Sequence, residues 1–324
     1  MYGATANDWF FLQDSRLSEG ITLTGQCMVR YAGDGIDKWY QELFGCNSRF
    51  YTDTDSVLFS LDEIVKKYMS GVEDKTKITN GLIKVIDAKI QPILNASMAS
   101  LSDYLNLDAT RLSFKREFVA DRALMIAKKM YMTRVYNNEG VEYPEGDLKI
   151  MGITVVRSST PQIVRTHLTD MLPMLLDEDI GKIQTHIEKT REIYMNAKPE
   201  EIAFPRGVKD IAKWETPTGP KKGCPIHVRA SIVHNMMVKD KKLENDVPNI
   251  NPGDKMKFVY TVLPNPTKNN VIGFIDKLPS EFKMEPYIDY GTMWEKSFMK
   301  PVEDFLSAAG VVIPDAADIT SFFG

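Results

Sequence analysis

The hexapeptide Tyr-Thr-Asp-Thr-Asp-Ser at residues 51–56 constrains this chain more than any other feature. A glycine-containing polar approach precedes it, and the apolar run 57–59 follows it, as expected for a strand. Because successive side chains of a strand alternate, an extended segment would turn Asp53 and Asp55 to the same face, where both could bind one hard cation. The alternative is a solvated turn, which is the usual setting of an isolated Asp-x-Asp.

Composition limits the kind of metal site and the setting of the protein. With 324 residues the chain is long enough for two domains, and its composition of 43% hydrophobic and 26% charged residues is ordinary for a globular protein. No apolar run approaches the ~20 residues of a membrane-spanning helix, so we expect no membrane partner and a cytoplasmic location. Cys27, Cys46 and Cys224 are scattered and lack histidines at ligand spacing, so any metal is expected to be carboxylate-bound Mg²⁺ rather than zinc.

Positive charge is concentrated in one stretch of a chain whose net charge is −4. Between Arg206 and Lys242 there are nine basic residues, against the three acidic residues Asp210, Glu215 and Asp240. This excess predicts a surface that faces a polyanion. A solvated, lysine-rich surface is the alternative.

Hydrophobic periodicity predicts an α+β chain with helices on one side of an antiparallel sheet. Apolar residues recur at helical spacing over 18–43, leading into the Asp53/Asp55 segment, and again over 76–105, with Pro92 as a possible break. Alternation over 112–119 predicts a strand, and the polar segment 136–147 predicts a hairpin or domain edge.

The second half of the chain predicts further helices and a pair of strands. Ser159 or Thr160 is expected to cap a helix that begins at Pro161, and a helical stripe covers 180–197. Residues 199–220 are expected to be irregular. Alternating residues at 256–262 predict a strand whose partner lies at 271–275.

The motif Tyr-x-Asp-Thr-Asp-Ser followed by an apolar run resembles the palm motif of family B DNA polymerases, where aspartates on a tight hairpin hold the Mg²⁺ ions of nucleotidyl transfer. Other segments resemble phage polymerases of the T-even type in the same order along the chain. These segments are the end of the fingers motif at Tyr2-Gly3 with the residues up to Phe10, Lys129-Met130-Tyr131, 148–152, 158–161, 224–229 and the tail 317–324.

This resemblance covers essentially the whole chain and implies its domains. A palm with an antiparallel sheet and helices on one side is expected over 1–147, with a remnant of the fingers motif at 1–3. A mostly helical thumb with a small β element is expected over 148–316. The tail 317–324 resembles the peptide that binds a sliding clamp.

The resemblance also implies roles for individual residues. Asp55 would be the stronger ligand of two Mg²⁺ ions and Asp53 a supporting one, with Glu117 as a third acidic neighbour. Thr52 stands where the family usually has glycine, which bears on the fine geometry of the turn. Contacts to the incoming nucleotide are implied for Tyr2, Gly3 and Thr54. Contacts to primer-template DNA are implied for Lys129, Tyr131, Lys221, Lys222 and Arg229. Binding to the clamp is implied for Ile319, Phe322 and Phe323.

Several family motifs have no counterpart in these residues. The lysine and asparagine of the fingers motif, the first palm aspartate and the exonuclease carboxylates are all missing. The resemblance therefore implies the C-terminal subunit of a split DNA polymerase in an infected bacterial cell, inactive without an N-terminal polypeptide that supplies these groups.

Two other functions are compatible with these residues. One is a non-catalytic DNA-binding or clamp-tethering remnant of a polymerase, against which the retained Asp53 and Asp55 argue. The other is a glycosyltransferase whose Asp-x-Asp binds a nucleotide sugar through a divalent ion. That function would leave Lys129-x-Tyr131 and the Phe322-Phe323 tail unexplained.

Overall fold

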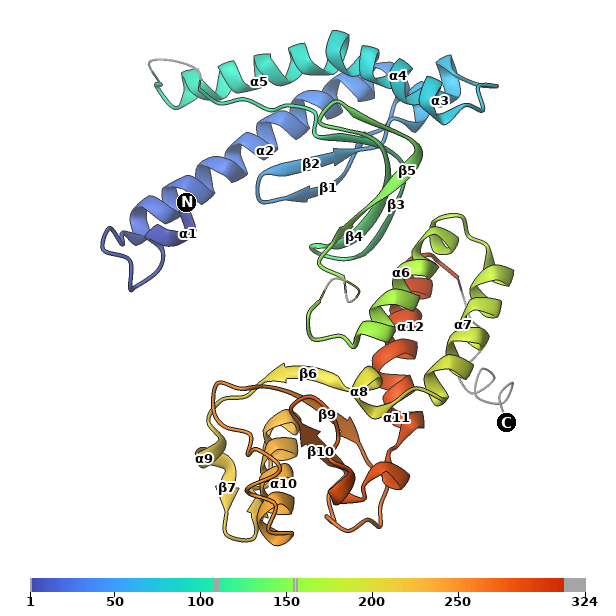
Figure 1. Cartoon of the computed structure of the whole chain (residues 1–324). Helices are drawn as coiled ribbons and strands as arrows, with labels where there is room; N and C mark the ends of the chain where they lie inside the picture. The colour runs from blue at the N-terminus through green and yellow to red at the C-terminus, as the bar shows by residue number, and fades with distance from the viewer. Residues whose placement is uncertain (1, 108–110, 154, 156, 312–324) are drawn as a thin grey trace. The chain divides into compact units, whose positions relative to one another are not determined.

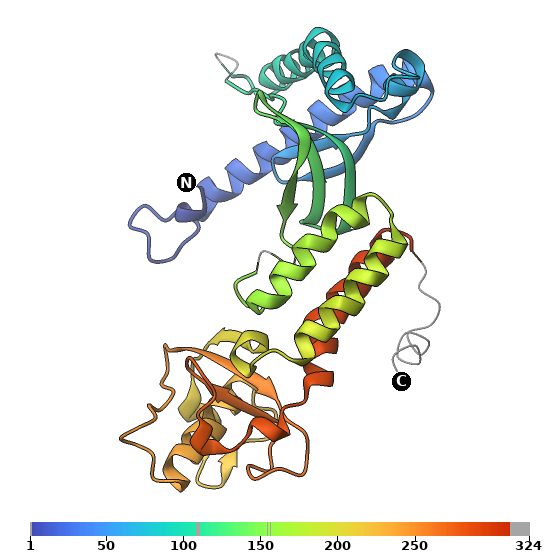
Figure 2. The ribbon, with the colours of Figure 1, turned by 45° about the vertical axis from the view of Figure 1, so that its right-hand side comes forward.

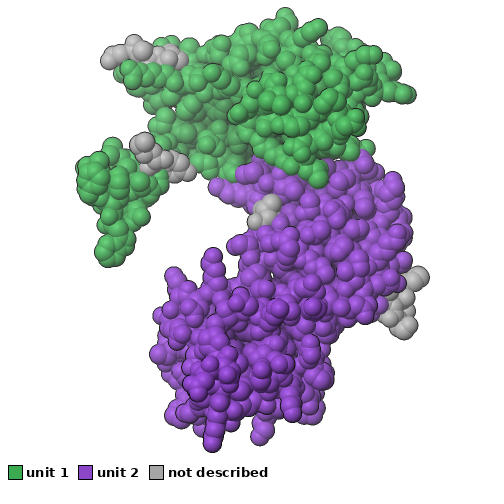
Figure 3. Space-filling model, in the orientation of Figure 1, with its two compact units in different colours: residues 1–122, 133–149 green, residues 123–132, 150–324 purple. Residues whose placement is uncertain are grey.

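A computed structural model describes residues 2–107, 111–153, 155 and 157–311, and the side chain of Tyr2 is outside the described part. Contacts divide the chain into two compact units (Figure 3). Unit 1 comprises residues 1–122 and 133–149, and unit 2 comprises 123–132 and 150–324. The chain is mixed α+β with small antiparallel sheets, as the periodicity predicts.

Unit 1 is built around the long helix α2, Ser15–Phe44, which follows the single turn α1, Tyr2–Thr5 (Figure 1). Asp14 caps its start by accepting a hydrogen bond from the backbone N–H of Arg16, and Gly45 ends it in the left-handed conformation with φ of 72°. Its 30 residues give a rod of roughly 45 Å. The helix predicted over 18–43 is therefore confirmed.

The helix predicted over 76–105 is also present, but Pro92 does not break it. Helix α4, Lys75–Val85, continues through a π-helical turn, η1, Ile86–Ile90, into α5, Gln91–Tyr104. The N–H of Gln91 bonds to the carbonyl of Ile86, five residues back. This wider turn comes just before Pro92, where a proline would otherwise remove an i→i−4 bond and clash with the preceding turn.

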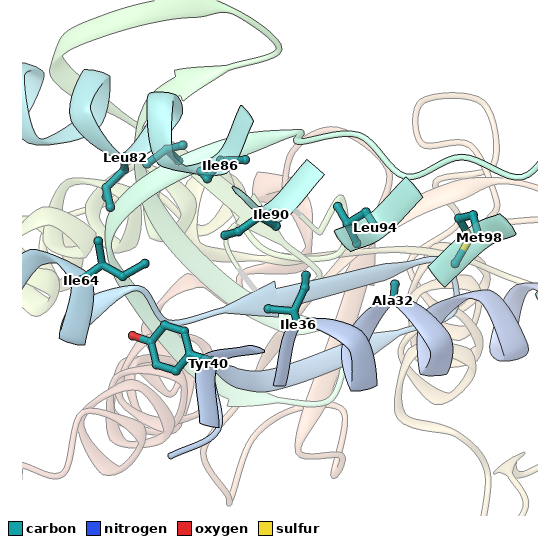
Figure 4. Packing of buried hydrophobic residues seen from close by; sticks show 10 residues of the cluster. Ala32, Ile36, Tyr40, Ile64, Leu82, Ile86, Ile90, Leu94 and Met98 are labelled. Carbon is teal, nitrogen blue, oxygen red and sulfur yellow. The ribbon is translucent and has the colours of Figure 1, made fainter. Parts of the chain in front are cut away.

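The core of unit 1 lies between α2 and the α4–η1–α5 helix (Figure 4). Ala32 and Ile36 of α2 face Ile90, Leu94 and Met98 across this interface. Each large aliphatic side chain buried there stabilises the fold by roughly 1.5–3 kcal/mol. These buried residues fix which face of α2 is turned toward the core, and thereby the position of the hairpin that follows α2.

Further along α2, the Tyr40 hydroxyl accepts a hydrogen bond from the N–H of Glu63 at 3.1 Å. Glu63 lies in the first turn of α3, Asp62–Tyr68, which directly follows the aspartate hairpin. The end of the hairpin is therefore tied to α2 as well.

A three-stranded sheet in the order β3-β4-β5 consists of Phe118–Ala127, Met130–Asn138 and Val141–Met151. The hairpin predicted within 136–147 is confirmed, with its turn at Glu139-Gly140. The strand predicted over 112–119 is wrong for most of its length, because β3 begins only at Phe118. The alternation arises because Leu112 and Phe114 pack on the unit 1 core without a paired strand.

In unit 2 the predicted helices are confirmed as α6, Gln162–Leu176, and α7, Ile180–Met195. The predicted cap is wrong, because Pro161 itself is the N-cap of α6 and no side chain makes a capping hydrogen bond. The helical set is completed, as seen in Figures 1 and 2, by α11, Tyr290–Trp294, the π-turn η5, Glu295–Met299, and α12, Lys300–Ala308.

The rest of unit 2 is a three-stranded sheet, in the order β10-β9-β6, that packs against helix α10, Ile226–Asp240. The predicted pair is present as β9, Lys255–Tyr260, and β10, Val271–Phe274. Residues 199–220 are not simply irregular, because β6, Phe204–Gly207, pairs with β9. The short helices α8 and α9 span Pro199–Ile202 and Ile211–Trp214. The short strands β7 and β8 span Glu215–Thr216 and Gly219–Pro220, and two 3₁₀ turns span Ser280–Phe282 and Glu285–Tyr287.

Candidate functional site

The two aspartates lie at the tip of a tight hairpin formed by β1, Arg49–Asp53, and β2, Ser56–Phe59. Asp53 pairs with Ser56, so that Thr54 and Asp55 form a two-residue turn. The expectation that both aspartates share one extended segment is therefore wrong, since Asp55 has left the strand. The turn, rather than strand alternation, sets how the two carboxylates are placed.

A buried carboxylate of α2 anchors the base of this hairpin. Asp37 is 8% exposed, and its Oδ1 accepts hydrogen bonds from the N–H groups of Ser48, at 3.1 Å, and Arg49, at 2.9 Å. Its Oδ2 forms an ion pair with Arg49 Nε at 3.0 Å. A charge-assisted network of this kind fixes both the position and the direction of the strand that enters the turn.

The same arginine also reaches Asp34 and lies on a glycine of α2. Arg49 Nη2 is 2.8 Å from Asp34 Oδ1. A Cβ added to Gly33 would overlap the guanidinium, so this position accommodates the arginine because it lacks a side chain. The hairpin is thus held on α2 by several side-chain contacts at this point.

The turn itself is ordered by Asp53. Its Oδ1 accepts hydrogen bonds from the Thr54 N–H at 2.8 Å and from the Thr54 hydroxyl at 3.2 Å. Asp55 is exposed, and with Thr54 it lines a cavity of about 550 Å³ against the N-terminal half of α2. The other residues lining this cavity include Arg16, Gly20, Thr24, Gly25 and Met28.

These two carboxylates suit a small hard cation, because Mg²⁺ in enzymes is commonly held by one or two protein carboxylates together with substrate phosphates. Within the described residues, no group of three or more histidine, cysteine, aspartate or glutamate side chains is placed to hold a metal ion. Glu117 forms an ion pair with Lys149 on β5. Its assignment as a third acidic neighbour stays a prediction.

Lys129 and Tyr131 lie at the hairpin of β3 and β4, Lys129 in its turn and Tyr131 on β4. Lys129 is exposed at the turn with φ of 62°, and Tyr131 is on β4 with 8% of its surface exposed. Gly3 belongs to α1 and has open space around its Cα. The structure places Thr54 beside the two aspartates in unit 1, whereas Lys129 and Tyr131 belong to unit 2.

The three basic residues singled out in unit 2 are grouped before and within α10. Lys221 and Lys222 are exposed, and Lys221 Nζ donates to the carbonyl of Lys213 at 2.7 Å. Arg229 is half-buried and donates to Asn270 Oδ1 at 3.3 Å. The structure does not describe the side chain of Tyr2. The clamp residues Ile319, Phe322 and Phe323 also lie outside the described part of the chain.

Sequence reasoning missed Asp37 and Arg49, which position the hairpin without being part of its turn. The signal was present in the helical stripe of α2, where a charged residue at 37 interrupts a run of buried positions between Ile36 and Tyr40. A carboxylate on a buried face needs a cationic or hydrogen-bonding partner. The chain supplies that partner at the first residue of the next strand.

Comparisons with known proteins agree with the motifs. The family described as divergent family B DNA polymerase matches residues 47–196, a segment that contains the aspartate hairpin and the β3-β4-β5 sheet. The resemblance to family B DNA polymerases is thereby confirmed.

Two curated relatives extend the similarity to the whole chain. The chain is 27% identical to the DNA-directed DNA polymerase of Enterobacteria phage T4 over 343 aligned positions, which cover 100% of this chain and 37% of the relative. Identity and coverage are the same for the DNA-directed DNA polymerase of Escherichia phage RB69. The chain thus spans little more than a third of the length of the relatives it matches.

Of the helices that the structure describes, none is both long and apolar enough to cross a membrane.

Proposed function

We propose that this chain forms part of the palm, the thumb and the clamp-binding tail of a family B DNA polymerase that extends a primer on a DNA template. The observation that carries the proposal is the Tyr-Thr-Asp-Thr-Asp-Ser hairpin, anchored on α2 through Asp37 and Arg49, in a chain similar throughout to phage DNA polymerases. Domain names and residue roles follow from that similarity.

In this proposal Asp53 and Asp55 hold Mg²⁺ at the hairpin turn. When bound, two such ions would activate the primer hydroxyl and stabilise the leaving pyrophosphate. The protein contributes orientation: the Asp53–Thr54 hydrogen bonds fix the turn, and Asp37 fixes the strand that leads into it. Pre-ordered carboxylates lose little freedom when the cation and nucleotide arrive.

DNA contacts are proposed for Lys129 and Tyr131 in the β3–β4 hairpin and for Lys221, Lys222 and Arg229 near α10. Lys129, Lys221 and Lys222 are exposed, as phosphate contacts require. Tyr131 is mostly buried, which suits a packing role beneath the primer end better than a stacking role. Contacts to phosphates supply affinity and register without reading sequence.

An exposed apolar surface at the N-terminal end supports the proposed companion polypeptide. In this surface Trp9 is 95% exposed and Phe11 is 85% exposed, and Leu17 and Ile21, one helical turn apart on α2, are each more than half exposed. Large apolar side chains that are gathered in one short stretch of the chain and exposed to this degree are typical of sites of association. The relatives' remaining length has no counterpart in these residues, and a polypeptide carrying that part would be the proposed occupant.

Primer extension by the reconstituted protein tests this function. The chain alone should not extend a primed template, whereas a mixture with a cognate polypeptide carrying the exonuclease, fingers and first palm motif should do so in the presence of Mg²⁺. A mixture made with Asp55→Asn controls for contaminating polymerase. Robust extension by the purified chain alone would contradict the need for a companion.

The same assay separates the alternative functions. A mixture that binds primed DNA and a sliding clamp, but never extends the primer, would favour a non-catalytic remnant. Manganese-dependent turnover of a nucleotide sugar, with no DNA binding, would favour a glycosyltransferase.

A further inference from the structure

Lys129 is held in a backbone conformation that a lysine rarely adopts. Its φ of 62° lies in the left-handed region, which is sterically unfavourable for a residue with a Cβ. Such a conformation persists only where the surrounding structure holds it. Lys129 is exposed in the turn between β3 and β4. The contacts that hold its backbone conformation must therefore come from the residues packed against that turn.

Gly152 supplies the first constraint, because its backbone lies directly against that turn. A Cβ added to Gly152 would overlap the carbonyl oxygen of Lys129 and would lie 3.5 Å from Met130 Cγ. Gly152 also has a positive φ of 64°, just after the end of β5. Both the conformation and the close approach therefore require glycine at this position.

Arg157 supplies the second constraint. Its Nη2 donates to the carbonyl of Gly152 at 3.1 Å and lies 3.6 Å from Met130 Sδ. The guanidinium thus joins the segment after β5 to the first residue of β4. All of these residues belong to unit 2, so the contacts are internal to one compact body.

We propose that Gly152 and Arg157 are positioning residues for DNA binding, which hold the β3–β4 turn in the conformation that presents Lys129 to a backbone phosphate of the primer-template duplex. This inference rests on the proposed function, which gives Lys129 its phosphate contact. Gly152 acts through van der Waals contact with the Lys129 carbonyl, and Arg157 acts by fixing Gly152 and Met130. Neither residue needs to touch the DNA.

A double-mutant cycle tests the inference. The full chain and its variants Gly152→Ala, Lys129→Ala and the double mutant are titrated with a fluorescent primer-template duplex at several salt concentrations. Gly140→Ala is the matched control, because Gly140 has a φ of 92° at the neighbouring β4–β5 turn but no atom within 4 Å of an added Cβ. Hydrogen exchange of the amides at 126–132 measures the turn without DNA.

Removal of the interaction between Lys129 and a phosphate should flatten the salt dependence of binding by up to ~0.9 log unit per log unit of salt. We expect this change in Lys129→Ala and in Gly152→Ala, with no further change in the double mutant, because Gly152 acts through Lys129. Amides of the turn should exchange faster in Gly152→Ala, and Gly140→Ala should leave both binding and turn exchange unchanged.

Other outcomes separate this inference from the function on which it rests. If Lys129→Ala does not alter the salt dependence, Lys129 makes no phosphate contact, and the proposed role of both positioning residues falls with it. If Lys129→Ala weakens binding while Gly152→Ala leaves binding and exchange unchanged, or if the two effects add, only the positioning role is overturned.

Arg157→Lys provides a second variant should Gly152→Ala fail to fold, because Arg157 is exposed and the charge is retained. It should also speed exchange at the turn and weaken binding, since an ammonium group cannot reproduce the planar contacts of a guanidinium. Unchanged exchange in Arg157→Lys would overturn the role of Arg157.

Discussion

Asp53 and Asp55 are two residues apart, yet their surroundings assign them different tasks. Asp53 ends a strand and uses Oδ1 to hold the backbone and hydroxyl of Thr54. Asp55 is in the turn, is exposed and lines the cavity next to α2. A carboxylate that faces the cavity is better placed for a cation that also binds substrate, whereas Asp53 supports the turn.

The first prediction follows from this difference. In the reconstituted enzyme Asp55→Asn should lower the rate of extension by orders of magnitude with little change in DNA affinity, because a metal ligand acts mainly in the transition state. Asp53→Asn should cost less, because an amide oxygen can still accept the hydrogen bonds from Thr54. Steady-state extension and duplex titrations measure both, and equal, mild effects would contradict the assignment.

His234 shows how a buried titratable residue links stability to pH. It is 1% exposed in α10, with Nδ1 2.9 Å from the carbonyl of Gly273 and Nε2 3.0 Å from that of Pro248. Burial lowers the pKa of His234 below its usual 6.5, although the two carbonyls oppose this effect. A neutral imidazole donates to only one of these carbonyls.

The second prediction concerns the stability of the protein below pH 6.5. Between the lowered pKa of His234 and 6.5 the unfolded chain binds more protons than the folded chain, so the free energy of unfolding should fall as the pH is lowered. Urea unfolding at pH 7.5 and 5.5 should show a smaller loss in His234→Gln than in the unchanged protein. Equal losses in the two proteins would show that His234 titrates alike in both states.

At the scale of elements, the packing of one helix on another determines where the aspartate hairpin lies. The π-turn Ile86–Ile90 lets one helix continue through Pro92 and cover α2. The covered half of α2 carries Asp37, which anchors β1 through Arg49. A change in the helix packing should therefore reach the aspartate turn through this ion pair.

The third prediction belongs to the segment that enters α10. Replacing Lys221, Lys222 and Arg229 with glutamine should weaken binding to primer-template DNA and flatten its salt dependence by up to ~0.9 log unit for each phosphate interaction that the substitutions remove. Glutamine at 229 can still bond to Asn270, so local structure should be retained. The experiment is a set of duplex titrations at increasing salt.

A matched control distinguishes specific contacts from general charge. Replacing the exposed Lys66, Lys67 and Lys77 of α3 and α4 with glutamine removes the same charge from a different part of the chain. An equal change in salt dependence in both triple variants would show that Lys221, Lys222 and Arg229 act only through net charge.

At the scale of the whole molecule, the proposed enzyme is an assembly. The chain matches 37% of the length of the phage polymerases, and its N-terminal region exposes Trp9 and Phe11. The tail residues Ile319, Phe322 and Phe323, outside the described part, form an apolar cluster in the sequence. We propose each feature as the point of attachment for a different partner.

The fourth prediction concerns that tail. Deleting Asp318–Gly324 should leave distributive extension by the reconstituted enzyme intact while abolishing its stimulation by the cognate sliding clamp, because a few apolar anchors carry most of the binding energy of such a peptide. Product lengths with and without clamp measure this. Retained stimulation together with a lower unfolding temperature would show that the phenylalanines belong to the core of the domain.

By itself the sequence determined the elements whose signals are local. Helical periodicity located α2 and α7, alternation located β9 with β10 as its expected partner, and a polar segment located the β4–β5 turn. The family resemblance was also readable, because its motifs are short strings such as Tyr-Thr-Asp-Thr-Asp-Ser. These signals arise from contacts within a few residues, where side-chain spacing alone specifies which face is buried.

Only the tertiary structure decided what depends on distant partners. Residues 112–117 alternate like a strand but lie outside β3, whereas β6 became a strand because β9, some fifty residues later, supplies its hydrogen bonds. Likewise the ion pair of Asp37 with Arg49, and the approach of Gly152 to Lys129, join residues from separate elements. A ladder or a buried ion pair needs both members brought together by the fold, and no local spacing in the sequence specifies the second member.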